Sequence, residues 1–294
     1  MYLKLENISK SYGDTKALSD VSFEINGNKI VGLVGRNGAG KTTLIKIIMN
    51  IMRPDTGEVK FEHENFQNNI GFLPEERGLY VNSTVKEQLL LIANLNGMPK
   101  KQGLENIKYY LEKLELGQHL NTTIKKLSKG NKQKIQLISA IIHNPEIIIL
   151  DEPFSGLDPV NALIFREIIL ECKRQKKLII FSSHRLDDIE ELCDYVLFLK
   201  NGEIFIQGDI KQIKEKYTPD QEYILDVDKD ITEILRQQEI DFYLTNRNEY
   251  NICGELGFDV QRLISTLVKQ EIKILTFYKK QVSLKEVFVK ELGE

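Results

Sequence analysis

The chain lacks any apolar run long enough to cross a membrane. A transmembrane helix needs about 20 consecutive apolar residues, whereas the apolar runs here are far shorter, and runs such as 147–150 and 196–199 are cut short by charged residues. Residues 1–7 also lack the basic leader and apolar stretch of a secretory signal. If this protein moves something across a membrane, we expect another polypeptide to supply the path.

Cysteine is scarce and neither sign of charge dominates. The three cysteines (Cys172, Cys193 and Cys253) are odd in number and lack the spacing of a metal site, which fits a reducing cytosol. The net charge of −3 provides no broad basic field, so sequence-independent nucleic-acid binding is not expected. At 294 residues and 41% hydrophobic content, the chain can form one large core and a small second domain.

One glycine-rich segment carries the clearest chemical signal. Residues 35–43 (GRNGAGKTT) match the pattern G-x-x-x-x-G-K-S/T, between an apolar strand at 30–34 and a helical pattern at 43–49. Such a loop points successive N–H groups at phosphates, and the following helix adds the positive end of its dipole. A chance match is expected in roughly one chain in a hundred of this length. The segment predicts a site for ATP or GTP, formed by Asn37, Gly38, Ala39, Gly40, Lys41, Thr42 and Thr43.

Within this site, two side chains have predicted roles of their own. Lys41 can reach the β- and γ-phosphates, and the Thr42 hydroxyl can ligate Mg²⁺.

Two carboxylates follow the apolar run 147–150. Successive side chains of a strand point to opposite faces, so Asp151 and Glu152 can do different jobs. We expect Asp151 to hold Mg²⁺ through water and Glu152 to lie near the attacking water. Residues 127–131 (LSKGN) form a short Ser/Gly turn before the helical pattern 133–142, which makes a second candidate anion site.

Taken in order, these motifs resemble the ATP-binding subunit of an ATP-binding cassette (ABC) transporter over residues 2 to about 216. The resemblance implies an α/β fold, a P-loop NTPase cassette with a mixed-sheet core, in a domain spanning 1–217. It also implies a helical subdomain at about 78–142 whose outer groove receives a helix from a membrane-spanning subunit. The expected cofactors are ATP and Mg²⁺, and the expected location is the cytoplasmic face of the membrane, as a peripheral subunit.

The same resemblance implies residue roles. Tyr12 matches the aromatic residue that stacks on adenine, Glu152 the catalytic base, and His184 the histidine that contacts the γ-phosphate. Asp158 matches the loop that crosses to the partner subunit. Ser128 and Gly130 match the signature motif that closes over the ATP held by the other subunit. The expected active unit is a head-to-tail dimer, of two identical or two paralogous chains, with two sandwiched ATPs.

Several of these residues also have structural interpretations. Alone, Tyr12 would be an ordinary half-buried strand aromatic, and His184 a hydrogen-bonded structural histidine. The lysine cluster at positions 125, 126, 129, 132 and 134 is a solvated face in the simplest interpretation. The order of the motifs along the chain favours the functional interpretation.

Two motifs depart from the family pattern, at three positions. Glu75 stands where the family has a glutamine that touches Mg²⁺; a carboxylate there still ligates Mg²⁺ but adds negative charge near the γ-phosphate. The usual Leu-Ser-Gly-Gly-Gln signature carries Lys129 and Asn131 here. Lys129 either adds favourable charge toward phosphate or points to solvent. Both variants resemble exporter ATPases of the sodium, antibiotic and peptide efflux type.

The pattern of the remaining sequence predicts the following elements. Strands are expected at 2–8, 21–25 and 29–34, with Asn26-Gly27 as a hairpin turn, and Asn201-Gly202 is expected to join strands 195–200 and 203–207. From about 84 to 142 the period is helical, with Val85, Leu89, Ile92 and Leu95 on one face. Residues 209–217 read as an exit helix.

Residues 218–294 are expected to form a small α+β domain. Its predicted order is strand 222–227, helix 231–238, hairpin 242–245 and 250–253, helix 260–269 and strand 272–278. Ser283 and Glu286 then cap a final helix. The order βαββαβ is typical of a ferredoxin-like fold. It resembles the C-terminal accessory domain of exporter ATPases, which either supports or regulates the dimer or only adds packing.

The function expected from the sequence is ATP hydrolysis that powers an ABC exporter through dimer closure. One alternative is a soluble ABC ATPase of translation or cluster assembly, but the single P-loop disfavours ribosome-acting members, which carry two cassettes. The interval between Lys41 and Ser128 leaves no room for the coiled coil of DNA-repair relatives. A second alternative is a weakly hydrolysing regulatory half of a heterodimer.

Overall fold

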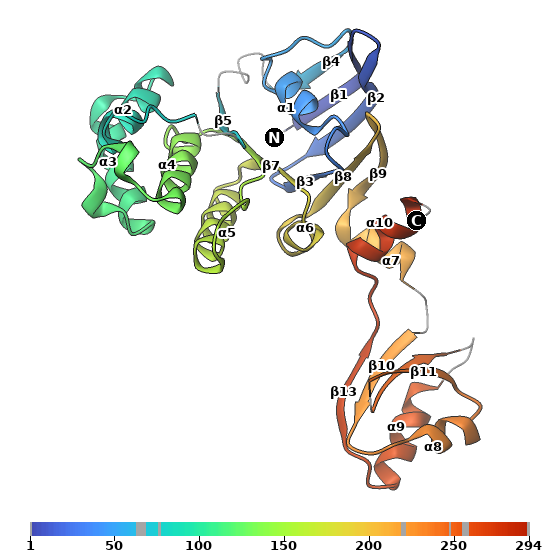
Figure 1. Ribbon diagram of the computed structural model, residues 1–294. Coiled ribbons are helices and arrows are strands. Elements are labelled where there is room, and N and C mark those ends of the chain that lie inside the picture. The colour runs from blue at the N-terminus through green and yellow to red at the C-terminus, as the bar shows by residue number, and fades with distance from the viewer. Residues whose placement is uncertain are drawn as a thin grey trace. The chain divides into compact units, whose positions relative to one another are not determined.

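The computed structural model describes residues 2–62, 69–75, 78–218, 222–246, 248–254 and 259–292 (Figure 1). The chain divides into two compact units, Met1–Ile210 and Lys211–Glu294. The division falls at the first residue of helix α7 (Ile210–Tyr217), whereas the sequence suggested a boundary after that helix.

A six-stranded sheet forms the centre of the first unit. Its order is β5-β6-β7-β3-β8-β9, and all neighbours pair in parallel except β8 and β9. Strands β3, β6 and β7 are buried at every position, as expected for parallel strands covered on both faces. The strands are β3 (Ile30–Val34), β5 (Ile70–Leu73), β6 (Ile147–Asp151), β7 (Leu178–Ser183), β8 (Tyr195–Lys200) and β9 (Glu203–Asp209).

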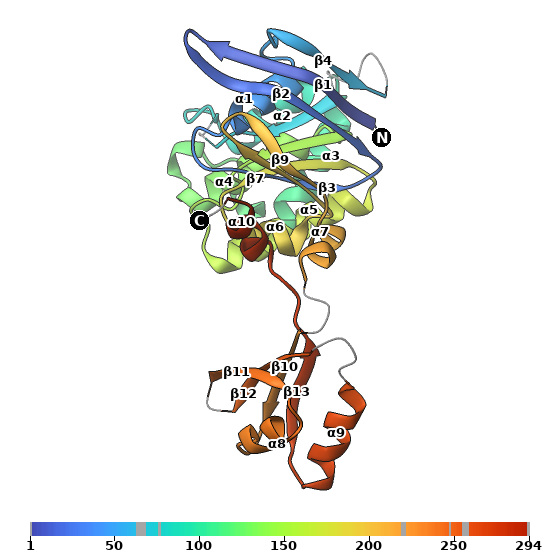
Figure 2. The ribbon, with the colours of Figure 1, turned by 90° about the vertical axis from the view of Figure 1, so that its right-hand side faces the viewer.

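A second, antiparallel sheet has the order β2-β1-β4, formed by β1 (Tyr2–Tyr12), β2 (Thr15–Asn26) and β4 (Thr56–Phe61). Helix α1 (Lys41–Ile48) lies between the two sheets, because its buried Leu44, Ile45, Ile47 and Ile48 share one hydrophobic core with residues of both. On the other face of the six-stranded sheet, α5 (Pro159–Arg174) packs on β7, and α6 (Leu186–Leu192) packs on β3 and β7 (Figure 2).

Three further helices form a group of their own. Helix α2 (Val85–Leu95) contacts α3 (Lys100–Lys113) and α4 (Lys129–Ile141), and α4 joins the group to β5. Single 3-10 turns lie at Gly117–His119 and Ile124–Lys126. The buried face of α2 carries Val85 and Leu89 as expected, but Leu95 is exposed and Ala93 takes its place inside.

The second unit has the βαββαβ order that the sequence predicts. Strands β10 (Glu222–Val227), β11 (Asp241–Asn246), β12 (Glu249–Cys253) and β13 (Ile274–Lys279) form an antiparallel sheet of order β11-β12-β10-β13. Its core packs α8 (Thr232–Gln237) and α9 (Val260–Lys269) on one face of the sheet. The predicted capping box is confirmed at α10 (Leu284–Leu292), where Ser283 and Glu286 bond each other's backbone N–H groups.

The two Asn-Gly pairs behave differently. Asn201 and Gly202 have φ of 51° and 80°, and they close the predicted β8–β9 hairpin. The predicted hairpin at Asn26-Gly27 is wrong, because β2 pairs with β1 while β3 pairs with β7 and β8. Only Gly27 of that pair has positive φ, so the segment carries the chain from one sheet to the other.

Candidate nucleotide-binding site

A pocket of about 660 Å³ opens at the carboxyl ends of β3, β6 and β7. This is the edge at which open α/β sheets bind their ligands. The pocket brings together most of the residues that the sequence singled out. Its lining consists of Ala17, Arg36, Asn37, Gly38, Gly40, Lys41, Thr42, Thr43, Glu75, Asp151, Glu152, Ser155 and His184.

The phosphate loop after β3 depends on two glycines in left-handed conformation. Gly38 has φ of 82° and Gly40 has φ of 106°. A Cβ on Gly40 would lie 2.6 Å from the carbonyl oxygen of Ala17, so no larger residue fits there. The Lys41 ammonium donates to the carbonyl oxygens of Gly35 (2.6 Å) and Arg36 (3.3 Å), which holds it across the loop.

The end of β6 separates its two carboxylates. Asp151 is buried and accepts a hydrogen bond of 2.5 Å from the Ser182 hydroxyl on β7. Glu152 leaves the strand with φ of 50°, a backbone conformation that residues other than glycine seldom adopt. Its N–H donates to the same Ser182 hydroxyl at 3.0 Å. The hydroxyl of Ser182 therefore fixes the Asp151 carboxylate and the Glu152 backbone relative to β7.

Glu152 faces His184 across the pocket. Nδ1 of His184 lies 2.9 Å from Oε2 of Glu152, and the imidazole is mostly exposed. Burial raises the pKa of Glu152, while His184 and Lys41 oppose that rise. A carboxylate with a raised pKa beside a histidine is the arrangement expected of a general base.

The pocket also offers oxygen ligands suited to Mg²⁺. The hydroxyl of Thr42 and the carboxylates of Asp151 and Glu75 all line it, and hard oxygen donors are what this ion prefers. Among the described residues, no group of three or more His, Cys, Asp or Glu gathers as a metal site. Phosphate oxygens and water usually supply the remaining ligands of Mg²⁺ in nucleotide sites.

Four expected site residues lie outside the pocket lining. Tyr12 ends β1 with 48% of its surface exposed, and its hydroxyl contacts the sulfur of Met52 at 2.9 Å. Ala39, within the phosphate loop, is buried. Ser128 caps α4 by accepting from the Asn131 N–H, and Gly130 lies in the first turn of that helix. The helix thus begins at Lys129, four residues before the predicted start.

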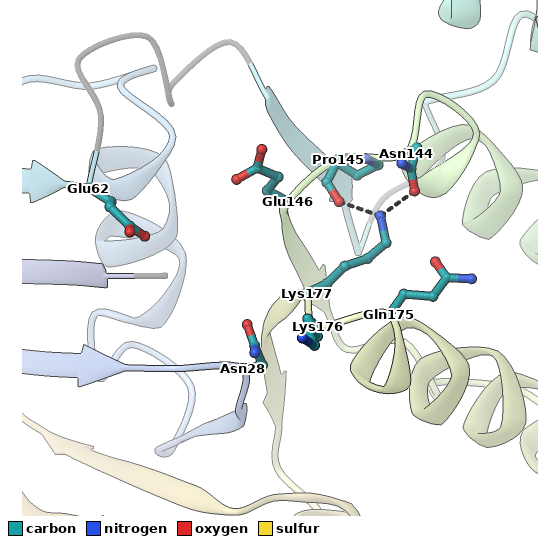
Figure 3. Close-up of a pocket in the computed structure, with 8 residues that line it drawn as sticks. All are labelled: Asn28, Glu62, Asn144, Pro145, Glu146, Gln175, Lys176 and Lys177. Atoms are coloured by element: carbon teal, nitrogen blue, oxygen red, sulfur yellow. Dashed lines mark hydrogen bonds between the residues drawn. The ribbon is translucent and has the colours of Figure 1, made fainter.

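A second pocket, of about 540 Å³, lies at the opposite edge of the parallel strands (Figure 3). Its lining includes Asn28 before β3, Glu146 before β6 and Lys177 before β7. The ammonium of Lys177 donates to Asn144 Oδ1 and to the Pro145 carbonyl, both at 2.6 Å. Lys177 is thus engaged in holding the chain before β6, and the amino edge of a parallel sheet is not where ligands usually bind.

Comparison with known proteins agrees with this geometry. A family model described as ABC transporter matches residues 18–155. An uncharacterized ABC transporter ATP-binding protein of Methanocaldococcus jannaschii is 47% identical over 73% of this chain and 80% of its own length. The bacitracin transport ATP-binding protein BcrA of Bacillus licheniformis is 30% identical over 99% of this chain and 97% of its own.

Solved structures show the same fold. A structure described as the ATP-binding subunit of an ABC transporter aligns with a TM-score of 0.69 and 30% identity, over 74% of this chain and 93% of its own. The fold and site therefore define a P-loop ATPase cassette. The chain belongs to the ABC transporter ATP-binding proteins, a family that binds ATP.

In the part of the chain that the structure describes, no helix combines the length and apolar character that crossing a bilayer requires.

Ser182 carries no local sequence signal that would mark it, although its hydroxyl bonds both the Asp151 carboxylate and the backbone N–H of Glu152. We predict that Ser182→Ala destabilises the fold by about 1–3 kcal/mol, because it removes a hydrogen bond from a buried carboxylate and leaves the Glu152 N–H unpaired. ATPase turnover should fall as well, since Glu152 loses the bond that holds its backbone. Chemical unfolding and steady-state hydrolysis measure the two effects.

The matched control is Ser183→Ala on the same strand. The Ser183 hydroxyl accepts from the Arg185 N–H at 3.0 Å and bonds neither carboxylate in the described hydrogen bonds. Equal turnover in the two variants would contradict the role given to Ser182.

Proposed function

We propose that this protein is the ATP-hydrolysing subunit of an ABC exporter, acting at the cytoplasmic face of a membrane through a separate membrane-spanning subunit. The observation that carries the proposal is the Glu152–His184 pair at 2.9 Å, in one pocket with the phosphate loop. Export is favoured by the similarity, over nearly the whole chain, to a bacitracin transport protein.

In this proposal Glu152 takes a proton from the attacking water while His184 remains near the γ-phosphate. Lys41 exchanges its loop carbonyl partners for the β- and γ-phosphates, and the loop N–H groups stabilise the developing charge. Mg²⁺ held by Thr42 and Asp151, with Glu75 as a further ligand, would neutralise phosphate charge. Tyr12 would stack on the adenine.

The complete site needs a second subunit. Ser128 and Gly130 lie outside the pocket that holds Lys41 and Glu152, so in a head-to-tail dimer they would close over the partner's ATP. Asp158 caps α5 through the Asn161 N–H at 3.0 Å, which fixes the loop that would cross to the partner. ATP binding would close this dimer, and hydrolysis would reopen it.

We assign residues 1–217 to the ATPase domain, with the helical subdomain at about 78–142, and residues 218–294 to an accessory domain. We propose that the accessory domain supports or regulates the dimer. The alternative is that it contributes only packing contacts.

We predict that Glu152→Gln lowers ATP turnover by roughly 10²–10⁴-fold, the usual contribution of a positioned base, while ATP still binds. The amide keeps the shape of the side chain but cannot take the proton. Steady-state hydrolysis and calorimetric ATP binding check the two halves. Glu167→Gln on α5 changes charge equally at an exposed position outside the pocket and should leave turnover intact. Unchanged turnover in Glu152→Gln would show that Glu152 is not the general base.

The dimer model predicts complementation between two inactive variants. Ser128→Arg blocks closure over the partner's ATP, and Lys41→Ala removes the chain's own phosphate contact, so each homodimer should be inactive. A mixed dimer should recover activity at one composite site. In that site the Ser128→Arg subunit supplies Lys41 and the Lys41→Ala subunit supplies Ser128. Ser128→Arg also removes a helix cap, at about 1 kcal/mol, so its ATP binding serves as the test of folding. If both variants are folded, and ATP binding shows this for Ser128→Arg, a mixture without ATPase activity would contradict the head-to-tail arrangement.

The transporter assignment predicts a stable membrane partner. The tagged chain, purified from gently solubilised membranes of its native cell, should bring down a polytopic membrane protein in stoichiometric amount. Recovery in the soluble fraction or on ribosomes would favour the soluble ABC ATPase. Slow hydrolysis alone but fast hydrolysis with a paralogous subunit would identify a heterodimer.

A further inference from the structure

Two of the three positions that depart from the family pattern lie on one pocket. Glu75 at the end of β5 and Lys129 in the first turn of α4 line a cavity of about 550 Å³. Glu152 and Ser155, from the loop after β6, line the same cavity. Glu75, Glu152 and Ser155 also line the nucleotide pocket, so the charge in this cavity acts directly beside the nucleotide.

The structure directs Lys129 toward its own chain. Its ammonium lies 2.7 Å, and its Cε 3.2 Å, from the point that a Cβ on Gly156 would occupy. Gly156 has φ of 71°, in the loop that follows Glu152. One turn further along α4, the amide of Gln133 donates to the Ser155 carbonyl at 2.6 Å. The beginning of α4 is therefore held against the loop beside the catalytic carboxylate.

Without Lys129, the described side chains that line the cavity would carry negative charge only. Among the described lining residues, Glu75 and Glu152 are the carboxylates and Lys129 is the cation. Glu152 has His184 as its close partner. A glutamine at position 75 would need no such offset, whereas the carboxylate of Glu75 faces incoming triphosphate with the same sign of charge.

We propose that Lys129 is a positioning residue that acts within its own subunit: it offsets the negative charge of Glu75 beside the nucleotide pocket and packs over Gly156. The inference rests on the proposed function, because it concerns the same ATP site. It differs from a contact to the partner's phosphate and from a lysine that only points into solvent.

The test is the affinity for ATP without metal, measured by calorimetry in EDTA at low salt and at concentrations where sedimentation shows a monomer. In a monomer no partner phosphate is present, and in EDTA the role of Glu75 as a metal ligand does not contribute. Glu75→Gln should tighten ATP binding by roughly two- to fivefold, and Lys129→Met should weaken it by a similar factor, the range typical of exposed charges. The double variant should return to the wild-type affinity.

Two further variants test whether the effect depends on the charge of Lys129 and on its position. Lys129→Arg keeps the charge and should bind ATP as the wild type does. Lys125→Met is the matched control, because it removes the same charge from an exposed lysine outside both cavities, and it should have no such effect. At about 1 M salt, where the Debye length is about 3 Å, the differences should shrink.

The inference is overturned if Lys129→Met matches Lys125→Met, or if Glu75→Gln and Lys129→Met shift affinity in the same direction. If the wild type binds ATP and Glu152→Gln lowers its turnover, but Lys129→Met leaves the ATP affinity unchanged, only this inference is overturned. A wild type that binds no ATP would overturn the proposed function and this inference with it.

Discussion

The site depends on the register between β6 and β7, where Asp151 stands opposite Ser182. Both strands are buried throughout, so a polar group at their ends must find a partner within the protein. The Ser182 hydroxyl meets this need twice, as donor to Asp151 and as acceptor from the Glu152 N–H. That bond supports the unusual backbone of Glu152, which in turn aims its carboxylate at His184. A single buried hydroxyl thus links the sheet to the reacting end of the site.

The phosphate loop could be predicted from sequence because its signals are local. Glycines at 38 and 40 supply the positive φ that the turn needs, and Lys41 begins the helix that follows. Ser182 could not be found this way, because its role arises from a strand pairing that joins residues 31 positions apart in the chain. The same holds for the contact of Gln133 with Ser155. Short-range patterns identify a loop, whereas tertiary contacts determine what holds a carboxylate in place.

The Asn-Gly pairs show how tertiary packing overrides a local turn preference. Every position of β3 is buried, whereas β2 alternates buried and exposed side chains over its second half, and the two strands belong to different sheets. Pairing with β7 and β8 places β3 inside the six-stranded sheet, whose faces are covered by α1 on one side and by α5 and α6 on the other, so the chain leaves its first sheet at Gly27. The β1–β2 hairpin forms instead around Gly13, with Tyr12 opposite Thr15. At Asn201-Gly202 the flanking strands do pair, since β9 is an edge strand with partly exposed side chains.

Within the second unit, the βαββαβ sheet lies between two helices in chain order, α7 and α10. Its entering and leaving segments are bonded to each other: the Val282 N–H donates to the Thr218 hydroxyl, and Lys280 pairs with Glu222 at 2.8 Å. Beyond them, Tyr217 of α7 donates to Glu291 of α10. A single flexible linker would let such a domain sample many orientations, whereas two bonded segments move together. The two connections to the βαββαβ sheet are therefore tied to each other, and so are the two helices that flank it in the chain.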